Sequence, residues 1–296
     1  MIVKDGRAIA RGWTQQGGRP HAEAQALTGA GPQARGATAY VTLEPCAHAS
    51  SRGPACSDLL VEAGISRVVT AIEDPDPRTA GSGLARLRNA DVRAEVLVSD
   101  AADESLAGYL ARARYGRPFV TLKLATSLDG CIALANGESR WITGEQARAH
   151  VHSRRAMSDA ILVGGGTWRQ DRPRLDVRLA GLEDRSPQRV LLSRGIAPDG
   201  VKVINAPDQI ASLDAVQYLY IEGGAGAAAS FLAADLVDRL EIYRAPVVIG
   251  NGLPALGDVG LATLADAHGH WRHVEQRQLG SDIFTAYRRT RQEGSK

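Results

Sequence analysis

The sequence predicts an α/β protein built from two units. Three observations support this prediction: strand-like and helix-like segments alternate along the chain, 296 residues suit two domains of ordinary size, and the alternation restarts after Gly116-Arg117-Pro118. Glycine and proline at that point favour a short linker. We therefore expect one unit at residues 1–115 and a second at residues 118–290.

The elements of the first unit follow from local patterns. "AEAQALTGAG" and "CSDLLVEAG" are typical of short helices that end at glycine, and "SRVVTAIED" is typical of a buried strand. The expected elements are strands at 8–13, 37–44 and 66–74, helices at 22–31 and 56–64, a helix and a strand within 83–100, and a helical segment over 102–116.

The second unit opens with a strand, "FVTLKLATSLDG", that runs into a loop. "WITGEQARAHVHSRRAMSD" predicts a helix with Thr143 as N-cap and Glu145 in the first turn, where an acidic side chain is favoured. The expected later elements are strands at 160–167 and 189–193, a strand, glycine turn and helix over 216–234, and a strand within 236–250.

Composition and charge exclude several classes of protein. Lys and Arg number 35 against 33 Asp and Glu, so nothing indicates a nucleic-acid or membrane partner. No apolar run approaches the ~20 residues that a membrane-spanning helix needs. Three cysteines do not make a disulfide framework, which favours a cytoplasmic protein.

Cys46 and Cys56 are separated by nine residues, and that spacing alone leaves three interpretations: a metal pair, a disulfide, or two small core residues. Upstream, His21 and Glu23 stand at the start of a predicted helix. A zinc deaminase needs three nitrogen or sulfur ligands and a nearby carboxylate that carries protons without binding the metal. His21, Cys46 and Cys56 therefore favour a zinc site, with Glu23 as the catalytic acid and base.

Four segments resemble the deaminase half of the bifunctional riboflavin-biosynthesis family RibD: "GGRPHAEAQAL", "GATAYVTLEPCAH", "GPACSDLLVEAGISRVV" and "EDPDPRTAGSG". The resemblance implies a cytidine-deaminase-like fold with one zinc ion, and it implies that His48 contacts the substrate. In that family a loop that helps to hold the substrate separates the two cysteines.

Family members carry an N-terminal helix and an Asn-Pro-x-Val-Gly segment ahead of the part that matches "MIVKDGR". We expect that segment to be missing from this sequence. Either the start has been assigned downstream of the true one, which we favour because the zinc and acid/base residues are intact, or the deaminase half is inactive.

"YIEGGAGAAASFL" also fits a dinucleotide-binding pattern, with Gly224, Gly226 and Ala229 at the glycine positions and Glu241 downstream. A single match of this kind is weak evidence for that fold. A second strand that ends in glycines lies at residues 162–167. Glycine turns that lead into helices expose backbone amides to phosphate, so the two turns predict an anionic cofactor at one sheet edge.

The second unit resembles the RibD reductase half in "FVTLKLATSLDGCIA", in residues 137–178 and in the segment from Tyr220 to Ile249. The resemblance implies a dihydrofolate-reductase-like fold that binds NADPH. The implied cofactor contacts are Ala125, Trp141, Thr167, Asp171, Ser193, Gly224, Ala225, Gly226, Ala227, Ala228, Ala229 and Ser230. The implied substrate contacts are Ser139, Arg155, Leu175, Arg178 and Glu222.

Chemistry favours Arg155 and Arg178 as ligands of a substrate phosphate, because a guanidinium group binds phosphate oxygens bidentately. Lys123 and Asp129 are secondary candidates for proton transfer, and Cys131 is expected to be a small buried residue. The sequence thus predicts a bifunctional enzyme that deaminates a phosphorylated ribosylaminopyrimidine and reduces its ribosyl group, and that forms a homo-oligomer. The alternative is a reductase whose deaminase unit is an inactive scaffold.

Overall fold

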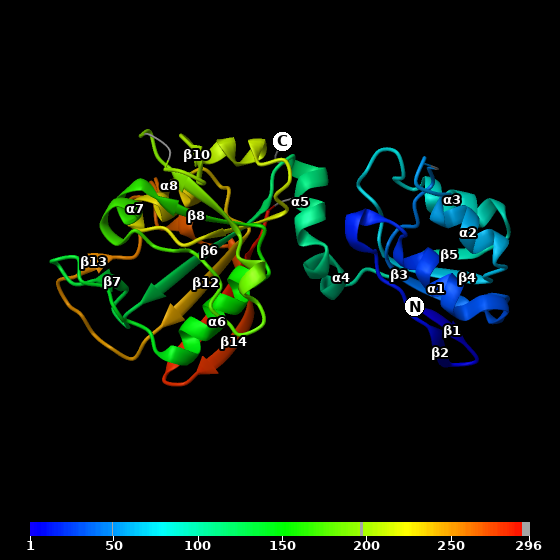
Figure 1. Ribbon diagram of the computed structural model, residues 1–296, viewed down its shortest axis with the longest axis horizontal. Helices are drawn as coiled ribbons and strands as arrows, with labels where there is room; N and C mark the ends of the chain where they lie inside the picture. The colour runs from blue at the N-terminus through cyan, green and yellow to red at the C-terminus, as the bar shows by residue number, and fades with distance from the viewer. Residues whose placement is uncertain (49, 196–197, 292–296) are drawn as a thin grey trace. The chain divides into compact units, whose positions relative to one another are not determined.

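The computed structural model describes residues 1–48, 50–195 and 198–291. The chain divides into two compact units, Met1–Arg114 and Tyr115–Lys296 (Figure 1). In the described part of the chain, no helix has the length and apolar character needed to cross a membrane.

The first unit is built on a five-stranded sheet in the order β2-β1-β3-β4-β5. The pairs β3–β4 and β4–β5 are parallel, and β1 runs antiparallel to both of its neighbours. The strands are β1 (Ile2–Lys4), β2 (Arg7–Ala10), β3 (Thr38–Leu43), β4 (Arg67–Ile72) and β5 (Arg93–Val96). The helices are α1 (Ala22–Ala30), α2 (Cys56–Glu62), α3 (Ser82–Asn89), α4 (Asp100–Ser105) and α5 (Ala107–Tyr115).

Helices α1, α2 and α3 cover one apolar core of this sheet. Leu84 and Leu87 of α3 lie three residues apart on one helix face and pack with Leu60 of α2 and Val68 of β4. The helical segment predicted over 102–116 is confirmed, although Leu106 divides it into α4 and α5. The Ser105 hydroxyl donates to the carbonyl oxygen of Ala102, a local bond that competes with the helical pattern.

The second unit contains an eight-stranded sheet in the order β10-β9-β8-β11-β6-β12-β15-β14, and adjacent strands from β10 to β12 are all parallel. Its strands are β6 (Phe119–Thr126), β8 (Ala160–Gly164), β9 (Gln188–Leu192), β10 (Lys202–Ile204), β11 (Tyr218–Ile221), β12 (Arg239–Arg244), β14 (Trp271–Leu279) and β15 (Asp282–Arg289). Two short strands, β7 (Cys131–Ala133) and β13 (Leu253–Pro254), pair separately.

Helices α6 (Glu145–Ala156) and α8 (Ala225–Ala233) pack on opposite faces of this sheet, while α7 (Gly165–Asp171) follows β8 directly. Leu162 of β8 points to the face with Ala228 and Phe231 of α8, whereas Ile161 points to the face with Val151 of α6. The alternation has the period of two expected for a strand buried on both faces, and it yields a helix–sheet–helix sandwich.

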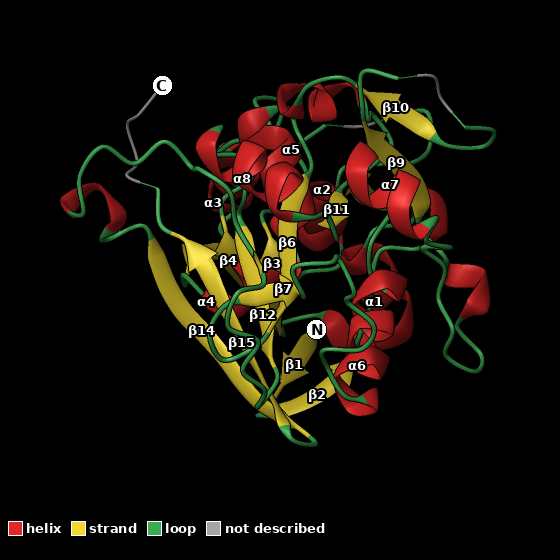
Figure 2. Ribbon diagram, turned by 90° about the vertical axis from the view of Figure 1, so that its left-hand side faces the viewer, coloured by secondary structure: helices red, strands yellow, loops and turns green. Residues whose placement is uncertain are grey.

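Several features of the second unit differ from the prediction. The strand expected at 160–167 ends at Gly164 and helix α7 follows it, and strand β10 was not predicted. The N-cap of α6 is Gly144, not Thr143, and its amide donates to Asp282 Oδ2 at 2.6 Å. Strands β14 and β15 form a long antiparallel hairpin at one edge of the sheet that the sequence analysis did not predict (Figure 2).

Candidate active sites

His21, Cys46 and Cys56 come together in the first unit from three different elements. His21 is the N-cap of α1, Cys46 follows β3, and Cys56 is the first residue of α2. The His21 Nδ1 atom lies 3.7 Å from Cys46 Sγ and 3.3 Å from Cys56 Sγ, and all three ligand atoms lie within 4.8 Å of one another. All three cysteines are free, which contradicts the disulfide interpretation.

The geometry of these three atoms fits zinc. Zinc bonds of about 2.3 Å to sulfur and about 2.0 Å to nitrogen place such ligands roughly 3.5 Å apart in a tetrahedral site. A hydrogen bond from the Cys56 thiol lowers the pKa of Cys46 to about 3, and the same bond raises the pKa of Cys56. The lowered pKa favours the thiolate at Cys46, and metal binding would displace the proton of the Cys56 thiol.

Glu23 lies in the first turn of α1, two residues after the histidine ligand. Burial raises the pKa of its carboxyl group above the ordinary value. A carboxyl group with a raised pKa can both accept and donate a proton near neutral pH, which suits a catalytic acid and base. His48 is half-buried, with Nδ1 3.5 Å from Thr79 Oγ1.

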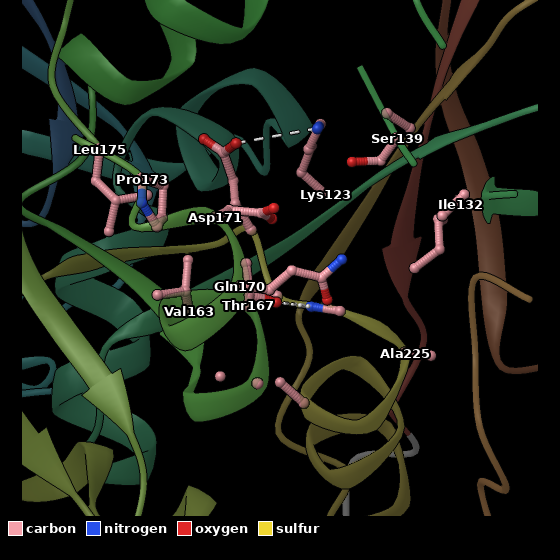
Figure 3. Close-up of a pocket in the computed structure, with 18 of the residues that line it drawn as sticks. Lys123, Ile132, Ser139, Val163, Thr167, Gln170, Asp171, Pro173, Leu175 and Ala225 are labelled. Atoms are coloured by element: carbon pink, nitrogen blue, oxygen red, sulfur yellow. Dashed lines mark hydrogen bonds and ion pairs between the residues drawn. The ribbon is translucent and has the colours of Figure 1, made fainter. Parts of the chain in front are cut away.

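The second unit contains a cavity of about 1360 Å³ at the carboxyl ends of β6, β8, β9 and β11. It is larger than the roughly 300–1,000 Å³ typical of small-molecule sites, so it has room for a dinucleotide together with a second ligand. Lys123, Ser139 and Asp171 face the same space (Figure 3). An open parallel sheet generally binds ligands at this edge.

Two glycine turns meet at this edge, because β8 and β11 are parallel neighbours. The Gly224 amide donates to Thr167 Oγ1 at 3.1 Å, which ties the turn before α8 to the start of α7. A Cβ on Gly223 would lie only 2.7 Å from Ala227 Cβ, so glycine is required for this close packing. The first amides of α8 have no partners within the helix and can bind a phosphate group, so the edge fits the pyrophosphate of a dinucleotide.

Arg155 and Glu222 form a nearly buried ion pair at the cavity wall. Arg155 Nε and Nη2 donate to the Glu222 carboxylate at 2.6 and 3.0 Å, and Nη1 donates to the Asp176 carbonyl oxygen at 2.8 Å. Burial would raise the pKa of Glu222, but the Arg155 charge and hydrogen bonds hold it below its usual range. Lys123 Nζ lies 3.9 Å from Glu222 Oε2, and burial lowers the pKa of this lysine.

Both halves of the chain match known family models. The model for the cytidine and deoxycytidylate deaminase zinc-binding region matches residues 1–72, and the RibD C-terminal domain model matches residues 118–285. The riboflavin biosynthesis protein RibD of Escherichia coli K12 is 37% identical over 96% of this chain and 90% of its own length. The Haemophilus influenzae RibD is 38% identical over 97% of this chain and 90% of its own length.

This chain belongs to the RibD family. Among solved structures, RibD of Acinetobacter baumannii superposes with a TM-score of 0.83 at 35% identity, covering 98% of this chain and 91% of that one. A Thermotoga maritima structure, described as a diaminohydroxyphosphoribosylaminopyrimidine deaminase/5-amino-6-(5-phosphoribosylamino)uracil reductase, also has a TM-score of 0.83, at 30% identity over 98% of this chain and 90% of that one. The predicted fold class is therefore confirmed, and the chain is a bifunctional riboflavin-biosynthesis enzyme.

The RibD reductase cavity gathers most of the residues that the sequence analysis selected for it. The selected residues that line it are Ala125, Ser139, Trp141, Arg155, Thr167, Asp171, Leu175, Arg178, Ser193, Glu222, Gly224, Ala225, Gly226, Ala227 and Ser230. Ala228 and Ala229 are selected residues that do not line it. Both are buried, Ala228 within the apolar core, because they lie on the side of α8 that packs inward.

Two roles derived from residue chemistry are not supported by the RibD reductase geometry. The Arg155 guanidinium group donates hydrogen bonds to the Glu222 carboxylate and to the Asp176 carbonyl oxygen. These protein groups occupy its nitrogen atoms, so the guanidinium group is not open to bind a phosphate. Asp129 lies outside the cavity lining and accepts from the Gly250 amide at 2.7 Å, which fixes a loop. Cys131 is 6% exposed, as predicted.

Sequence reasoning missed most of the positive charge in the RibD reductase cavity. Besides Arg155 and Arg178, the lining contains Arg140, Arg148, Arg169, Arg172, Arg174 and Arg194. Glu241, the acid of the dinucleotide-like pattern, is fully buried and bonds to Tyr220 and Arg239. Arg169, Arg172 and Arg174 stand with Arg178 in one short run of the sequence, which was a local signal. Arg140, Arg148 and Arg194 come from other elements, and only the fold brings them to the same cavity.

Proposed function

We propose that the first unit hydrolyses the 2-amino group of 2,5-diamino-6-(5-phosphoribosylamino)pyrimidin-4-one, and that the second unit reduces the ribosyl group of the product to ribityl with NADPH. The observation that supports this most is the convergence of His21, Cys46 and Cys56 in a chain that also carries the large basic cavity. One unit thus has a hydrolytic centre and the other a site for anionic ligands.

In the deamination step His21, Cys46 and Cys56 would hold zinc, which makes a water molecule nucleophilic near neutral pH. Glu23 takes a proton from the attacking water and delivers it to the departing amine. Water adds to the ring carbon, the carbon–nitrogen bond breaks, and ammonia leaves. His48, on the loop after Cys46, contacts the substrate.

For the reduction, the glycine turns around Gly164 and Gly224 would hold NADPH, which would supply the hydride for the anomeric carbon of the ribosyl group. The carbon–oxygen bond of the sugar ring breaks as the new carbon–hydrogen bond forms, so the ring oxygen needs a proton. Lys123 is the proton donor in this proposal, because it lines the cavity and burial lowers its pKa. Ser139, Leu175 and Arg178 contact the substrate. Of the two arginines that the sequence analysis selected for the substrate phosphate, Arg178 is the one that keeps this role. The Arg155–Glu222 pair fixes the wall beside Lys123.

Ammonia release and NADPH oxidation, measured separately on the purified zinc-loaded chain, test the proposal. We expect both with the diamino substrate, and NADPH oxidation alone with the deaminated substrate. Bound zinc without ammonia release would support the alternative, a reductase with an inactive deaminase unit.

We further propose that the enzyme acts in the cytoplasm as a homo-oligomer without a nucleic-acid or membrane partner. The three free cysteines support a reducing compartment. Light scattering coupled to size-exclusion chromatography measures the oligomeric state. We expect a mass that is a whole-number multiple of the 31.4 kDa of one chain and larger than that of one chain.

A further inference from the structure

Residues 139–143 form part of the wall of the reductase cavity between β7 and α6, and all five line the cavity. We call them the wall segment. Ser139, a substrate contact in the proposed function, points into the cavity (Figure 3). Trp141 is the aromatic side chain that the sequence analysis assigned to the cofactor. It is 64% exposed, so packing against the core does not fix its orientation, and neighbouring side chains must hold it in place.

Arg148, in the first turn of α6, supplies such a contact. Its Cζ atom lies over the Trp141 ring, 4.8 Å from the ring centroid, which is the geometry of a cation–π interaction. Its Nη1 atom donates to the Thr143 carbonyl oxygen at 2.6 Å. Arg148 therefore holds both an aromatic side chain and the main chain of the wall segment.

Helix α6 presents Arg148 to the cavity together with Val151, His152 and Arg155. Spacings of three and four residues place these four side chains on one helix face. At the far end of this face, Arg155 pairs with Glu222. The same helix face thus fixes the wall segment at one end and the buried ion pair at the other.

Helix α7 holds the wall segment from its other side. Gln170 Nε2 donates to the Gly137 carbonyl oxygen at 3.2 Å, and Arg140 Nη2 donates to the Asp171 carbonyl oxygen at 3.4 Å. Arg140 also approaches the Trp141 ring, but its Cζ atom lies farther from the centroid, at 6.0 Å. These contacts restrain the main chain, whereas the indole depends mainly on α6.

We infer that Arg148 is a positioning residue of the reductase, which holds the Trp141 indole and with it the wall segment in the geometry that binds the cofactor. A side chain that is already ordered loses less rotamer freedom when a ligand binds, so this contact strengthens binding without touching the ligand. An arginine that bound a phosphate directly would act through its own charge and would not depend on the indole. This inference rests on the proposed function of the second unit.

A double-variant cycle on NADPH oxidation with the deaminated substrate separates these two roles. Arg148→Met and Trp141→Leu should each raise the KM for NADPH about tenfold and change kcat less than about threefold. The double variant should also stay near tenfold, because Arg148 has nothing to hold once the indole is gone. Arg148→Lys keeps a cation over the ring and should remain within about threefold of wild type. Arg185→Met changes an exposed arginine outside the cavity lining and should keep the wild-type KM.

Energy transfer from tryptophan to bound NADPH gives a second measurement that needs no turnover. The difference between wild type and Trp141→Leu at saturating NADPH gives the share of Trp141, and this share should fall about twofold or more in the Arg148→Met background. Arg148→Gln, which also removes the charge, repeats both measurements if Arg148→Met is unstable.

A wild-type KM in both Arg148→Met and Arg148→Gln would overturn the inference, as would a rise of about 100-fold in the double variant, which would assign Arg148 to direct contact with a ligand. Both outcomes leave the proposed function standing. A wild-type chain that fails to bind NADPH would overturn the proposed function and this inference with it.

Discussion

At the scale of single residues, the Arg155–Glu222 pair shows why chemistry read from one side chain can mislead. An arginine on a predicted helix suggested a phosphate ligand, but its partner is a carboxylate 67 positions away that only the fold brings within 2.6 Å. Both side chains are 11% exposed, so each compensates the other's buried charge.

Arg155→Ala should therefore lower the free energy of unfolding of the second unit by about 3 kcal/mol, because the buried Glu222 carboxylate loses both of its guanidinium hydrogen bonds and keeps only the more distant Lys123 as a charge partner. Urea denaturation measures the loss. The double variant Arg155→Met/Glu222→Met removes both charges and should be less destabilised than Arg155→Ala. If the double variant loses as much free energy of unfolding as Arg155→Met and Glu222→Met together, the two side chains do not compensate each other and this explanation is disproved.

The three proposed zinc ligands are a residue-level feature that the sequence selected and the structure brings together. Cys56→Ser should reduce zinc from one equivalent per chain to almost none and abolish ammonia release, because a structural or catalytic zinc site needs all its thiolate ligands. Plasma mass spectrometry on the dialysed protein gives the metal content. Cys131→Ala is the matched control, since Cys131 lies outside the cluster and should keep full zinc. Zinc retained in Cys56→Ser would exclude this residue as a ligand.

At the scale of elements, the parallel strands and the helices of both units were largely predictable. Their apolar runs and glycine ends are local signals, as in β4, β8 and α2. The β14–β15 hairpin was not, because β14 is an edge strand and most of its side chains are exposed. The N-cap of α6 depends on Asp282, a tertiary partner 138 residues from Gly144 that no local pattern shows.

The packing of α8 on the sheet edge gives an element-level prediction. Gly223→Ala would place a methyl group against Ala227, push the start of α8 away from β11, and lower kcat/KM for NADPH by on the order of 10²-fold. Steady-state kinetics measures the loss. Gly226→Ala is the control, because no protein atom lies within 4 Å of the methyl group that it adds. The thermal stability of this variant should equal or exceed that of wild type. Wild-type kinetics in Gly223→Ala would contradict the tight packing.

Helix α6 carries two histidines, His150 and His152, whose lowered pKa values predict a pH-dependent stability of the second unit. His150 Nδ1 lies 2.8 Å from Tyr243 Oη, and His152 Nδ1 accepts the Arg178 amide at 3.1 Å. Burial lowers the pKa of both below the ordinary 6.5. The unfolded chain therefore binds protons more readily, so the stabilisation is complete above pH ~6.5 and is lost as pH falls below it.

We expect the melting temperature of the second unit to fall between pH 7.5 and pH 5.5, as followed by scanning calorimetry. His150→Gln/His152→Gln should show a smaller fall, because the unfolded variant no longer gains those two protons. An identical fall in the variant would assign the pH dependence to other groups.

At the scale of the whole molecule, we assign two separate chemistries to the two units. The sequence order of the motifs allowed this prediction, since the zinc ligands lie between residues 21 and 56 and the cavity residues between 123 and 254. The sequence could not show that Arg140, Arg148 and Arg194 join the arginines of residues 169–178, because their meeting depends on the parallel order of β8, β9, β11 and β6.

Glu23→Gln tests the division of labour most directly, with the diamino substrate and the deaminated substrate assayed in parallel. Glutamine cannot carry the proton, so ammonia release should fall by at least about 10²-fold, while the zinc content and the rate of NADPH oxidation on the deaminated substrate stay at wild-type values. Loss of both activities together, or ammonia release at the wild-type rate, would contradict the assignment of one reaction to each unit.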